Sequence, residues 1–467
     1  MRTVLNVSSL PDACWIRCYS LNPPVSFMPE MLSTKVLVAC CITAVVVIST
    51  ACVVDGVEPR ENAKHLVRFL TIEQESAELE ALAEESIERF EKENPNIDVR
   101  REAISTEDQR AIIRTRLRSS RSPDLFSFDT GPGFAGVLAE AGLLYPLDRA
   151  YRKYEWPVFE WAKERVTFDG VLSGVPAKLE ELGVYYNKDV FDSFGFKEPR
   201  TLHQLQHIAG VVRTNGMIPF AFGNGEKWPA GHLFSMAVNN LLGPAGLDRA
   251  LFGVGRWNDT EVVKAIDLMF RRFAAKGFYP VNVNVIPYAD ANGLFYTGRA
   301  AMNPTGTWLI SELDGQDLAF GVGFFPFPSI GGSGITPPAG LGDGLFVAGN
   351  TDEPKATLKL LDYLVFSEQL VRDGLERFNE IPAFPVDTSG LVLSPLFKSV
   401  LNDLKVADGP SSFGYNIDVV APQRFNAVMS DGFSDVLGGN TSPVRQAKAM
   451  QEAYRQARRE GETLSKP

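Results

Sequence analysis

The stretch LVRFLTIEQESAELEALAEESIERFEKENPNIDV, residues 66–99, decides the fold class of this chain. Residues 66–72 are mostly apolar and predict a buried strand, and a second strand begins at Ile97. Between them, apolar residues recur at helical spacing after Ser76, which can cap the first turn, and Asn94-Pro95 ends the helix. Strand, helix and strand within ~35 residues form a crossover unit, which predicts a parallel sheet with helices on its faces.

The same alternation of strands and helices returns further along the chain. Residues 123–129 (PDLFSFD) predict a strand that ends in a carboxylate, and residues 135–144 predict a helix after a Gly-rich turn. Residues 183–191 (GVYYNKDVF) predict a strand that runs into a helix, and another strand starts at Ile218. Because ligands of such sheets bind beyond the carboxyl ends of the strands, acidic residues at those ends are candidates for a binding site.

The length of 467 residues exceeds the size of ~250 to 300 residues at which a single hydrophobic core stops growing, so we expect two lobes. The Pro- and Gly-rich residues 324–344 predict a crossing between them. The predicted parts are a start extension at 1–30, a signal peptide at 31–52, a tether at 53–64, a first lobe at 65–175 and 325–368, and a second lobe at 176–324 and 369–467.

The amino-terminal region has the pattern of an export signal. In MLSTKVLVACCITAVVVISTAC, residues 31–52, Lys35 precedes an uncharged apolar stretch that ends in small residues and is short for a membrane span of ~20 residues. The end resembles a lipoprotein cleavage site, although such sites usually have Leu where this chain has Ser49. We expect an exported protein with a lipid on Cys52; cleavage elsewhere and an uncleaved anchor are the alternatives.

The charge of the chain excludes one class of partner. The formal net charge is -11 and the pI is about 5.1, whereas binding to the nucleic-acid backbone needs clustered Lys and Arg. All five cysteines lie at or before Cys52, so no disulfide can form in the remainder of the chain. Absence of thiols there suits an oxidising compartment.

Metal and catalytic motifs are incomplete. His203 and His207 have the i, i+4 spacing of a metal pair, and Cys14 and Cys18 are also close in sequence, but neither pair has the further ligands that zinc requires. The sequence contains no GxSxG element and no GxxxxGK[ST] loop. We therefore expect no metal, no cofactor and no catalytic residue.

Six blocks of sequence together suggest a family. They are FEKENPN at 90–96, SPDLFSFD at 122–129, LAEAGLLYPLD at 138–148, GVPAKLEELGVYYNKDVFDSFGFKEPRTLHQL at 174–205, FYTGRAAMNPTGTW at 295–308 and LKLLDYLVFSEQ at 358–369. In order and spacing they resemble the carbohydrate-binding class of ABC-importer solute-binding proteins, the group that includes maltose- and trehalose-binding proteins. The resemblance spans residues 65–460.

The resemblance implies a fold, a function and partners. The fold is the two-lobed periplasmic-binding-protein fold of type II, α/β in class, with a parallel-rich sheet flanked by helices in each lobe and the ligand in the cleft between them. Hinge closure traps the ligand. The implied protein is a monomer without enzymatic activity that delivers a sugar, an oligosaccharide or a related polyol glycoside to membrane permease subunits driven by an ATPase.

A sugar presents hydroxyls at its rim and apolar C–H faces, so its site needs carboxylates or amides for the first and aromatic planes for the second. Trp308 matches a family position that commonly stacks on a sugar ring, and its alternative role is in a lobe core. Trp228, which we expect in a loop, is the second stacking candidate. Phe384 is the third, and a packed aromatic beside two prolines is its alternative.

The acidic candidates follow from the same resemblance. Glu75 and Asp129 match positions that accept hydrogen bonds from ligand hydroxyls, with helix capping as the competing role. Glu180 and Glu181 precede a strand where the family commonly places an acidic contact, and only one of the two needs to face the cleft. Asp343 lies between glycines that let the backbone approach a ligand, and a short turn is its alternative.

One basic candidate and two rival functions remain. Arg110 aligns with a position that binds ligand in the trehalose and maltose group, and a solvated helix charge is the competing interpretation.

The first rival function is a binder of the same fold for a non-sugar solute, such as a glycerol phosphodiester, a polyamine or an iron chelate. The second is a secreted carbohydrate-active enzyme, whose paired carboxylates sequence alone does not place.

Overall fold

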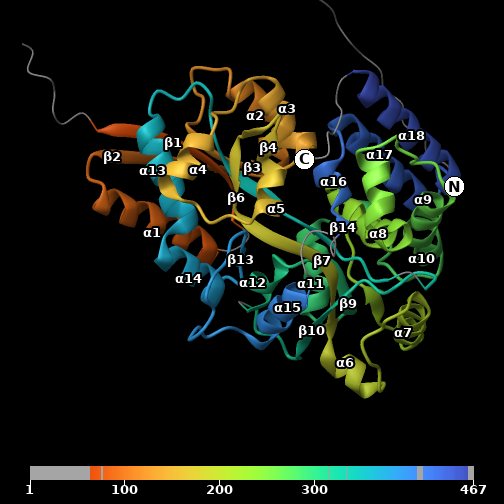
Figure 1. The fold of residues 1–467 in the computed structure, drawn as a ribbon. Coiled ribbons are helices and arrows are strands. Elements are labelled where there is room, and N and C mark those ends of the chain that lie inside the picture. Colours follow the sequence, from red (N-terminus) through yellow and green to blue (C-terminus); the bar gives the residue numbers. More distant parts are fainter. Residues whose placement is uncertain (1–63, 75–76, 315, 333, 407–413, 461–467) are drawn as a thin grey trace, which may run out of the picture. The chain divides into compact units, whose positions relative to one another are not determined.

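Strand β1, His65–Ile72, and helix α1, Ala77–Glu93, are the first elements of the described part of the chain in the computed structural model, as the first apolar run and the helical spacing predict (Figure 1). The structure describes residues 64–74, 77–314, 316–332, 334–406 and 414–460. They belong to one unit of the chain, Glu61–Pro467. The signal peptide, Cys52 and Glu75 lie outside the described residues.

The first sheet has the strand order β2-β1-β3-β12-β6. Its further strands are β2 (Ile97–Ile104), β3 (Leu125–Asp129), β6 (Gly174–Pro176) and β12 (Asp343–Val347). β1 pairs in parallel with β2 and β3, which confirms the predicted crossover units, whereas β12 runs antiparallel to β3 and β6. The carboxyl ends of β1 and β3 and the amino end of β12 therefore meet at one edge of the sheet.

Helices α1 and α13 (Pro354–Phe366) pack on this sheet. Phe90 of α1 is fully buried, and its ring lies 5.3 Å from that of Tyr363 on α13. The helix ends where the sequence predicts, because the side chain of Asn94 donates a hydrogen bond to the carbonyl oxygen of Phe90 over 2.8 Å, and Pro95 cannot continue the ladder. Local signals thus account for this helix and its end.

The second sheet is built around β7, Lys178–Asn187. The other strands are β8 (Ile218–Phe220), β9 (Ala300–Gly306), β10 (Val322–Pro326), β11 (Pro338–Gly340), β13 (Ile381–Pro382) and β14 (Gly414–Tyr415). Only β8 with β9 and β11 with β14 are parallel here; β9, β10, β11 and β13 all run antiparallel to β7. The predicted parallel pairing is therefore confined to two strand pairs of this sheet, because four segments that return from elsewhere in the chain share one long strand.

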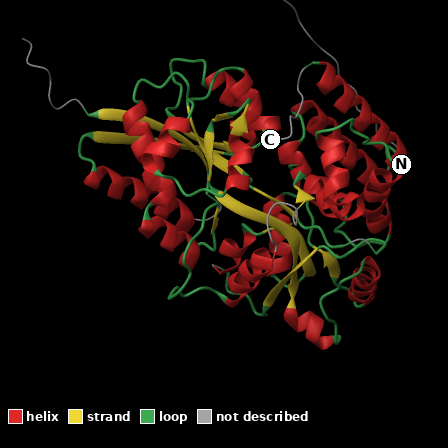
Figure 2. Cartoon of the chain, in the orientation of Figure 1, coloured by secondary structure: helices red, strands yellow, loops and turns green. Residues whose placement is uncertain are grey.

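The remaining elements surround these sheets (Figure 2). They are α2 (Thr106–Arg116), α3 (Val137–Glu140), α4 (Asp148–Tyr154), α5 (Glu160–Lys163), β4 (Thr167–Phe168), β5 (Val171–Leu172), α6 (Lys188–Ser193), α7 (Leu202–Thr214), α8 (Trp228–Leu251), α9 (Thr260–Ile266), α10 (Phe273–Ala275), α11 (Tyr288–Tyr296), α12 (Leu309–Asp314), α14 (Glu368–Arg377), α15 (Pro395–Val406), α16 (Ile417–Val420), α17 (Gln423–Leu437) and α18 (Pro443–Arg459), with short π or 3-10 turns at 132–136, 164–166, 267–272 and 283–285. In the described part of the chain, no helix combines the length and the apolar character needed to cross a membrane.

One predicted helix is shorter than expected. Residues 135–144 were expected to be helical throughout, but a π-helical turn, Pro132–Gly136, leads into α3, which ends at Glu140. Gly142 then takes a φ of 67°, a left-handed conformation that ends the helix. The expectation was wrong in extent because the glycine stops the helix before the apolar pattern does.

The chain passes between the two sheets at three places. The first is Ala177, between β6 and β7; the second is Leu341 and Gly342, between β11 and β12, inside the Pro- and Gly-rich stretch that predicts a crossing. The third is residues 378–380, between α14 and β13, where Asn379 has a φ of 53°. These short connections border the cavity described next.

Candidate ligand-binding site

A cavity of about 570 Å³ lies where the edges of both sheets meet. The first sheet contributes residues at the ends of β1, β3 and β12, and the second contributes the start of β7 and the segment after β9. The amino-terminal turns of α2, α8, α11 and α16 complete the wall. This is the edge at which the parallel strands of the first sheet predict a ligand site.

Three aromatic rings form one wall of the cavity. Trp228 lies 4.5 Å from Tyr288 and 6.4 Å from Trp308, measured between ring centroids. The structure thus brings together the two tryptophans predicted as stacking residues. It adds Tyr288, which no sequence pattern marked as a binding residue. Trp228 is not in a loop as expected: it is the first residue of α8, and Lys227 before it has a φ of 70°.

Hydrogen bonds hold Trp308 in place. Its indole N–H donates to the hydroxyl of Tyr288 over 2.8 Å, and that hydroxyl is 2.9 Å from Oγ1 of Thr305. The ring lies against Gly306, where any Cβ would clash with it. The indole is half-buried: one part packs against the hydrophobic core and another part lines the cavity. The alternative role of Trp308 in a lobe core is therefore only partly correct.

His232 lies one turn after Trp228 and extends the aromatic wall. Its ring centroid is 4.8 Å from that of Trp228 and 5.3 Å from that of Trp308. Burial and, to a smaller degree, the nearby charge of Arg110 lower the pKa of His232 to about 3, so the imidazole is neutral at neutral pH. A lone histidine in an apolar helix gave no reason to nominate it from sequence.

Arg110 and Asp129 form a bidentate ion pair at the cavity wall. Nε and Nη2 of Arg110 donate to the two carboxylate oxygens of Asp129 over 2.7 and 2.6 Å. The guanidinium carbon also lies 4.9 Å from the ring centroid of Phe134. The solvated-charge interpretation of Arg110 is therefore wrong: its side chain is 25% exposed and has a fixed partner, because α2 runs beside the end of β3.

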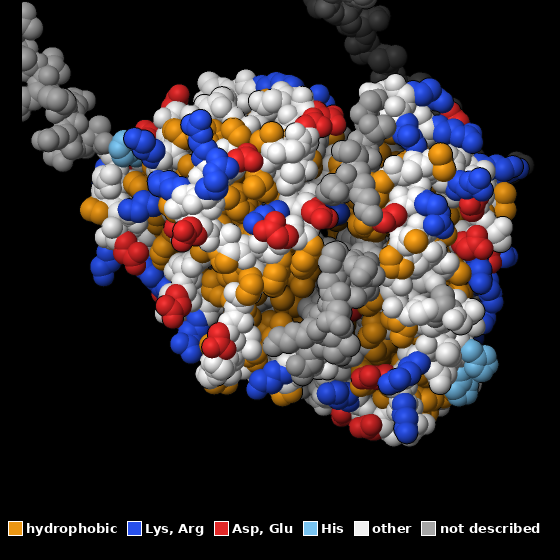
Figure 3. All heavy atoms as spheres, viewed as in Figure 1, with side chains coloured by type: hydrophobic (Ala, Val, Ile, Leu, Met, Phe, Trp, Pro, Cys, Tyr) orange, Lys and Arg blue, Asp and Glu red, His pale blue; other side chains and the backbone are white. Residues whose placement is uncertain are grey.

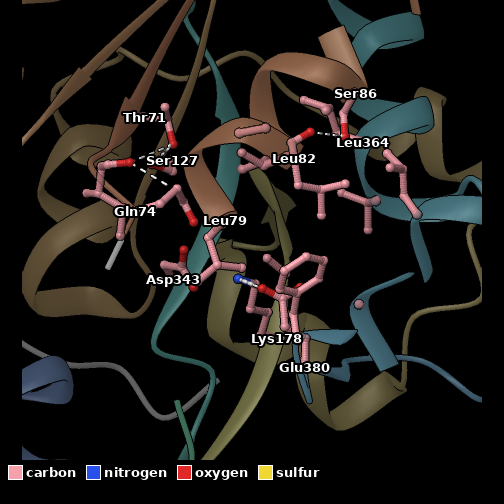
Figure 4. Close-up of a pocket in the computed structure, with 18 of the residues that line it drawn as sticks. Thr71, Gln74, Leu79, Leu82, Ser86, Ser127, Lys178, Asp343, Leu364 and Glu380 are labelled. Atoms are coloured by element: carbon pink, nitrogen blue, oxygen red, sulfur yellow. Dashed lines mark hydrogen bonds and ion pairs between the residues drawn. The ribbon is translucent and has the colours of Figure 1, made fainter. Parts of the chain in front are cut away.

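Four charged side chains gather at the crossings between the sheets. Lys178 forms an ion pair with Glu380, and Asp343 lies beside this pair (Figure 4). Burial and the neighbouring Asp343 raise the pKa of Glu180 to about 8, although Lys178 opposes the shift. Burial also raises the pKa of Asp343, against the influence of Lys178. Burial would lower the pKa of Lys178, but Glu380 and Asp343 raise it, so the ammonium stays charged.

Asp418, in α16, is a further carboxylate of the cavity that the sequence did not nominate. It is 8% exposed, and its Oδ1 has no hydrogen-bond partner among the described residues. Oδ2 lies 3.7 Å from Nε2 of His232. Burial and the charge of Asp129 raise the pKa of Asp418 to about 7, while Arg110 acts in the opposite direction. No spacing pattern distinguishes this aspartate from a helix-capping one.

Two nominated residues lie away from the cavity. Glu180 lines the cavity, so the alternation of side chains along β7 turns Glu181 to the other face, where it is 3% exposed. Phe384 is buried against Phe366, with 5.0 Å between ring centroids. It lines an adjoining pocket of about 250 Å³, which shares Lys178, Asp343 and Glu380 with the cavity (Figure 4). Glu180 is therefore the one glutamate of the pair that faces the cavity, as the sequence allows, whereas Phe384 does not line it. Glu75 lies outside the described residues.

The arrangement is suited to binding a polar ligand with apolar faces. Ring planes offer dispersion contacts, and the carboxylates that line the same cavity offer hydrogen-bond acceptors. Within the described ranges, no group of three or more His, Cys, Asp or Glu residues is placed to hold a metal ion. On the face in Figure 3, acidic and basic side chains are interspersed and form no continuous basic stripe.

Comparisons with known proteins agree with this geometry. Residues 72–370 match the family of bacterial extracellular solute-binding proteins. The multiple sugar-binding protein of Streptococcus mutans is 25% identical over 342 residues, 70% of this chain and 78% of that protein.

Solved structures share the fold. A chitin oligosaccharide binding protein has a TM-score of 0.77 and 23% identity, covering 84% of this chain and 99% of that chain. Maltose-bound MalE3 of T. maritima has a TM-score of 0.71 and 19% identity, again covering 84% of this chain and 99% of that chain. These similarities confirm the predicted two-lobed fold. The family match covers more than half of the sequence, and the chain belongs to the bacterial extracellular solute-binding proteins.

Proposed function

We propose that this protein captures a sugar, an oligosaccharide or a related polyol glycoside and delivers it to an ABC importer. The observation that carries the proposal is that the aromatic wall of Trp228, Tyr288 and Trp308 lines the same cavity of about 570 Å³ as several carboxylates. Sugars need both surfaces at once: ring planes for their C–H faces and acceptors for their hydroxyls. The sugar ligands named for the relatives and for the solved structures support this choice.

Capture works by closure of the two lobes. We propose that the two lobes are divided at the three connections between the sheets, which act as the hinge. The first lobe then comprises the described residues of 65–176 and 343–377, and the second those of 178–340 and 381–460. The boundaries expected at 324/325 and 368/369 shift because β10, up to Pro326, pairs with β7 and α14 packs on α13. These connections border the cavity. A ligand that contacts Lys178, Gly342 or Asn379 therefore touches the hinge or a residue next to it, and can favour the closed arrangement of the lobes. Closure brings Arg110 and Asp129 of one lobe towards the tryptophans of the other.

The setting of the protein follows the family. The signal at residues 31–52 is proposed to export the chain, and a lipid on Cys52 to hold it at the outer side of the membrane. There it works as a monomer and docks on permease subunits that an ATPase drives. It binds its ligand without cofactor and without chemical change.

Isothermal titration calorimetry of the purified protein against glucosides, galactosides, disaccharides and polyols tests the proposal. We expect saturable binding of at least one sugar that is lost in a Trp228→Ala, Trp308→Ala double variant which still unfolds cooperatively. Binding of a phosphodiester or a polyamine, with no response to any sugar, would overturn the carbohydrate assignment. Recovery of the bound sugar unchanged after long incubation is expected, and released product would instead establish an enzyme.

A further inference from the structure

We propose that the cavity selects a cationic saccharide, that is, a sugar carrying at least one free protonated amine. This inference rests on the proposed function and narrows its ligand class. It is based on an imbalance of charge among side chains that are buried or half-buried at the cavity.

Carboxylates outnumber cations around the cavity. Its wall contains eight acidic side chains but only two permanently cationic ones, Arg110 and Lys178. Three of the acids are exposed to solvent, namely Glu73, Glu107 and Glu226. The other five are buried or half-buried, namely Asp129, Glu180, Asp343, Glu380 and Asp418. Water screens the charges of the first group strongly and those of the second group much less.

Both cations are already engaged. Arg110 holds Asp129 through two hydrogen bonds, and Lys178 is paired with Glu380. In the part of the chain that the structure describes, no Lys or Arg forms an ion pair with Glu180, Asp343 or Asp418. Asp343 also stands directly opposite Asp129 in the pairing of β12 with β3, an arrangement that is unfavourable for like charges.

Asp418 is the clearest sign of a missing cation. Its side chain is 10% exposed, its Oδ1 has no hydrogen-bond partner among the described residues, and it lines the cavity. The neighbouring His232 is neutral, and its buried Nδ1 also finds no hydrogen-bond partner within the described ranges. A buried carboxylate that no cation pairs is costly, even with backbone N–H groups beside it, so an ammonium group of the ligand would stabilise it.

The aromatic wall is compatible with the same ligand. Faces of Trp and Tyr rings attract cations as well as sugar C–H groups, so Trp228, Tyr288 and Trp308 suit a ring that carries an ammonium substituent. A neutral sugar would leave Glu180, Asp343 and Asp418 without a cation, and closure of the lobes would remove more water from them. Their ionised forms would then have to take up protons, and the free energy of that uptake opposes binding.

Three β-1,4-linked disaccharides that differ only at C2 test the inference: those of glucosamine, N-acetylglucosamine and glucose. Calorimetry at about pH 7 is expected to give affinity at least about tenfold higher for the amine than for the other two, a ratio within reach of one or two charge contacts. Titration in buffers of different ionisation enthalpy is expected to show proton release with the amine. Equal or tighter binding of a neutral disaccharide, or proton uptake with the amine, would overturn the inference.

Variants locate the selectivity. Glu180→Gln and Asp418→Asn are expected to weaken binding of the amine by a larger factor than binding of the glucose disaccharide, so that the preference for the amine falls several-fold. Glu107→Gln removes the same charge from an exposed position of the same cavity and is the matched control. Equal loss of preference in all three variants would contradict the assignment to the buried carboxylates.

The result also separates this inference from the proposed function. If neutral sugars bind but no amino sugar binds more tightly, the carbohydrate function stands and the cationic ligand is refuted. If spermidine, a cation without a sugar ring, binds more tightly than every saccharide, both are refuted.

Discussion

The indole N–H of Trp308 donates a hydrogen bond to the hydroxyl oxygen of Tyr288 over 2.8 Å. One residue follows strand β9 and the other begins helix α11, and both line the cavity. The bond sets the plane of the indole before any ligand arrives, so less ordering remains to be done on binding. Trp308 is therefore the first residue to test.

Trp308→Ala is expected to weaken sugar binding by ~1 kcal/mol or more, because it removes a ring plane from the ligand site. Isothermal titration calorimetry measures the change. Trp161→Ala is the matched control. Trp161 stacks on Phe159, with 5.8 Å between the ring centroids, and does not line the cavity. Equal affinity of the Trp308 variant and the unmodified protein would remove this ring from the site.

Gly342→Ala is expected to weaken binding at least several-fold with little change in thermal stability. A Cβ at Gly342 would clash with the carboxylate of Glu180, so that side chain would have to leave its place in the cavity. Gly340→Ala, at the end of β11 two residues earlier, is the control, because a Cβ there meets no atom within 4 Å. Matching affinities for the two variants would show that the position of Glu180 is unimportant for the ligand.

Asp129→Asn is expected to lower the free energy of unfolding by about 1 to 3 kcal/mol, because it leaves the guanidinium of Arg110 without its bidentate partner. The side chains are 25% and 12% exposed, so the loss is smaller than for a fully buried pair. Urea denaturation measures it. Glu160→Gln breaks the ion pair of Lys163 with a carboxylate that is 89% exposed, and should leave stability unchanged.

Stability without ligand is expected to fall as pH rises from about 6.5 to 8.5. Burial raises the pKa of Asp418 to about 7 and that of Glu180 to about 8, so the folded protein retains protons that these groups lose in the unfolded chain. Unfolding therefore becomes easier as pH passes through these values, by on the order of 2 kcal/mol in total.

His232 does not obscure this pH effect. Its lowered pKa makes stability rise with pH, but only below about 6.5, where the unfolded histidine binds a proton. Thermal melts of the double variant Glu180→Gln, Asp418→Asn are expected to show a flat profile between pH about 6.5 and 8.5. An equally steep fall in this variant would assign the effect to other groups.

Local sequence patterns predicted the first half of the first sheet correctly. The apolar run of β1, the spacing in α1 and the stop at Asn94-Pro95 act over a few residues, so no distant contact was needed to interpret them. The same reasoning placed Asp129 at the end of β3, which is where the structure has it. In contrast, the helix at 135–144 was overextended because a single left-handed glycine outweighs an apolar pattern.

Within the site, the sequence by itself determined which kinds of residue are present, and only the tertiary structure decided which of them meet. Adjacent Glu180 and Glu181 must point to opposite faces of β7, but the face that borders the cavity depends on the crossing segments that pack there. Asp418 joins Arg110 and His232 from 308 and 186 residues away along the chain. Neighbours at such separations are set by how the sheets and helices pack, and no local periodicity records them.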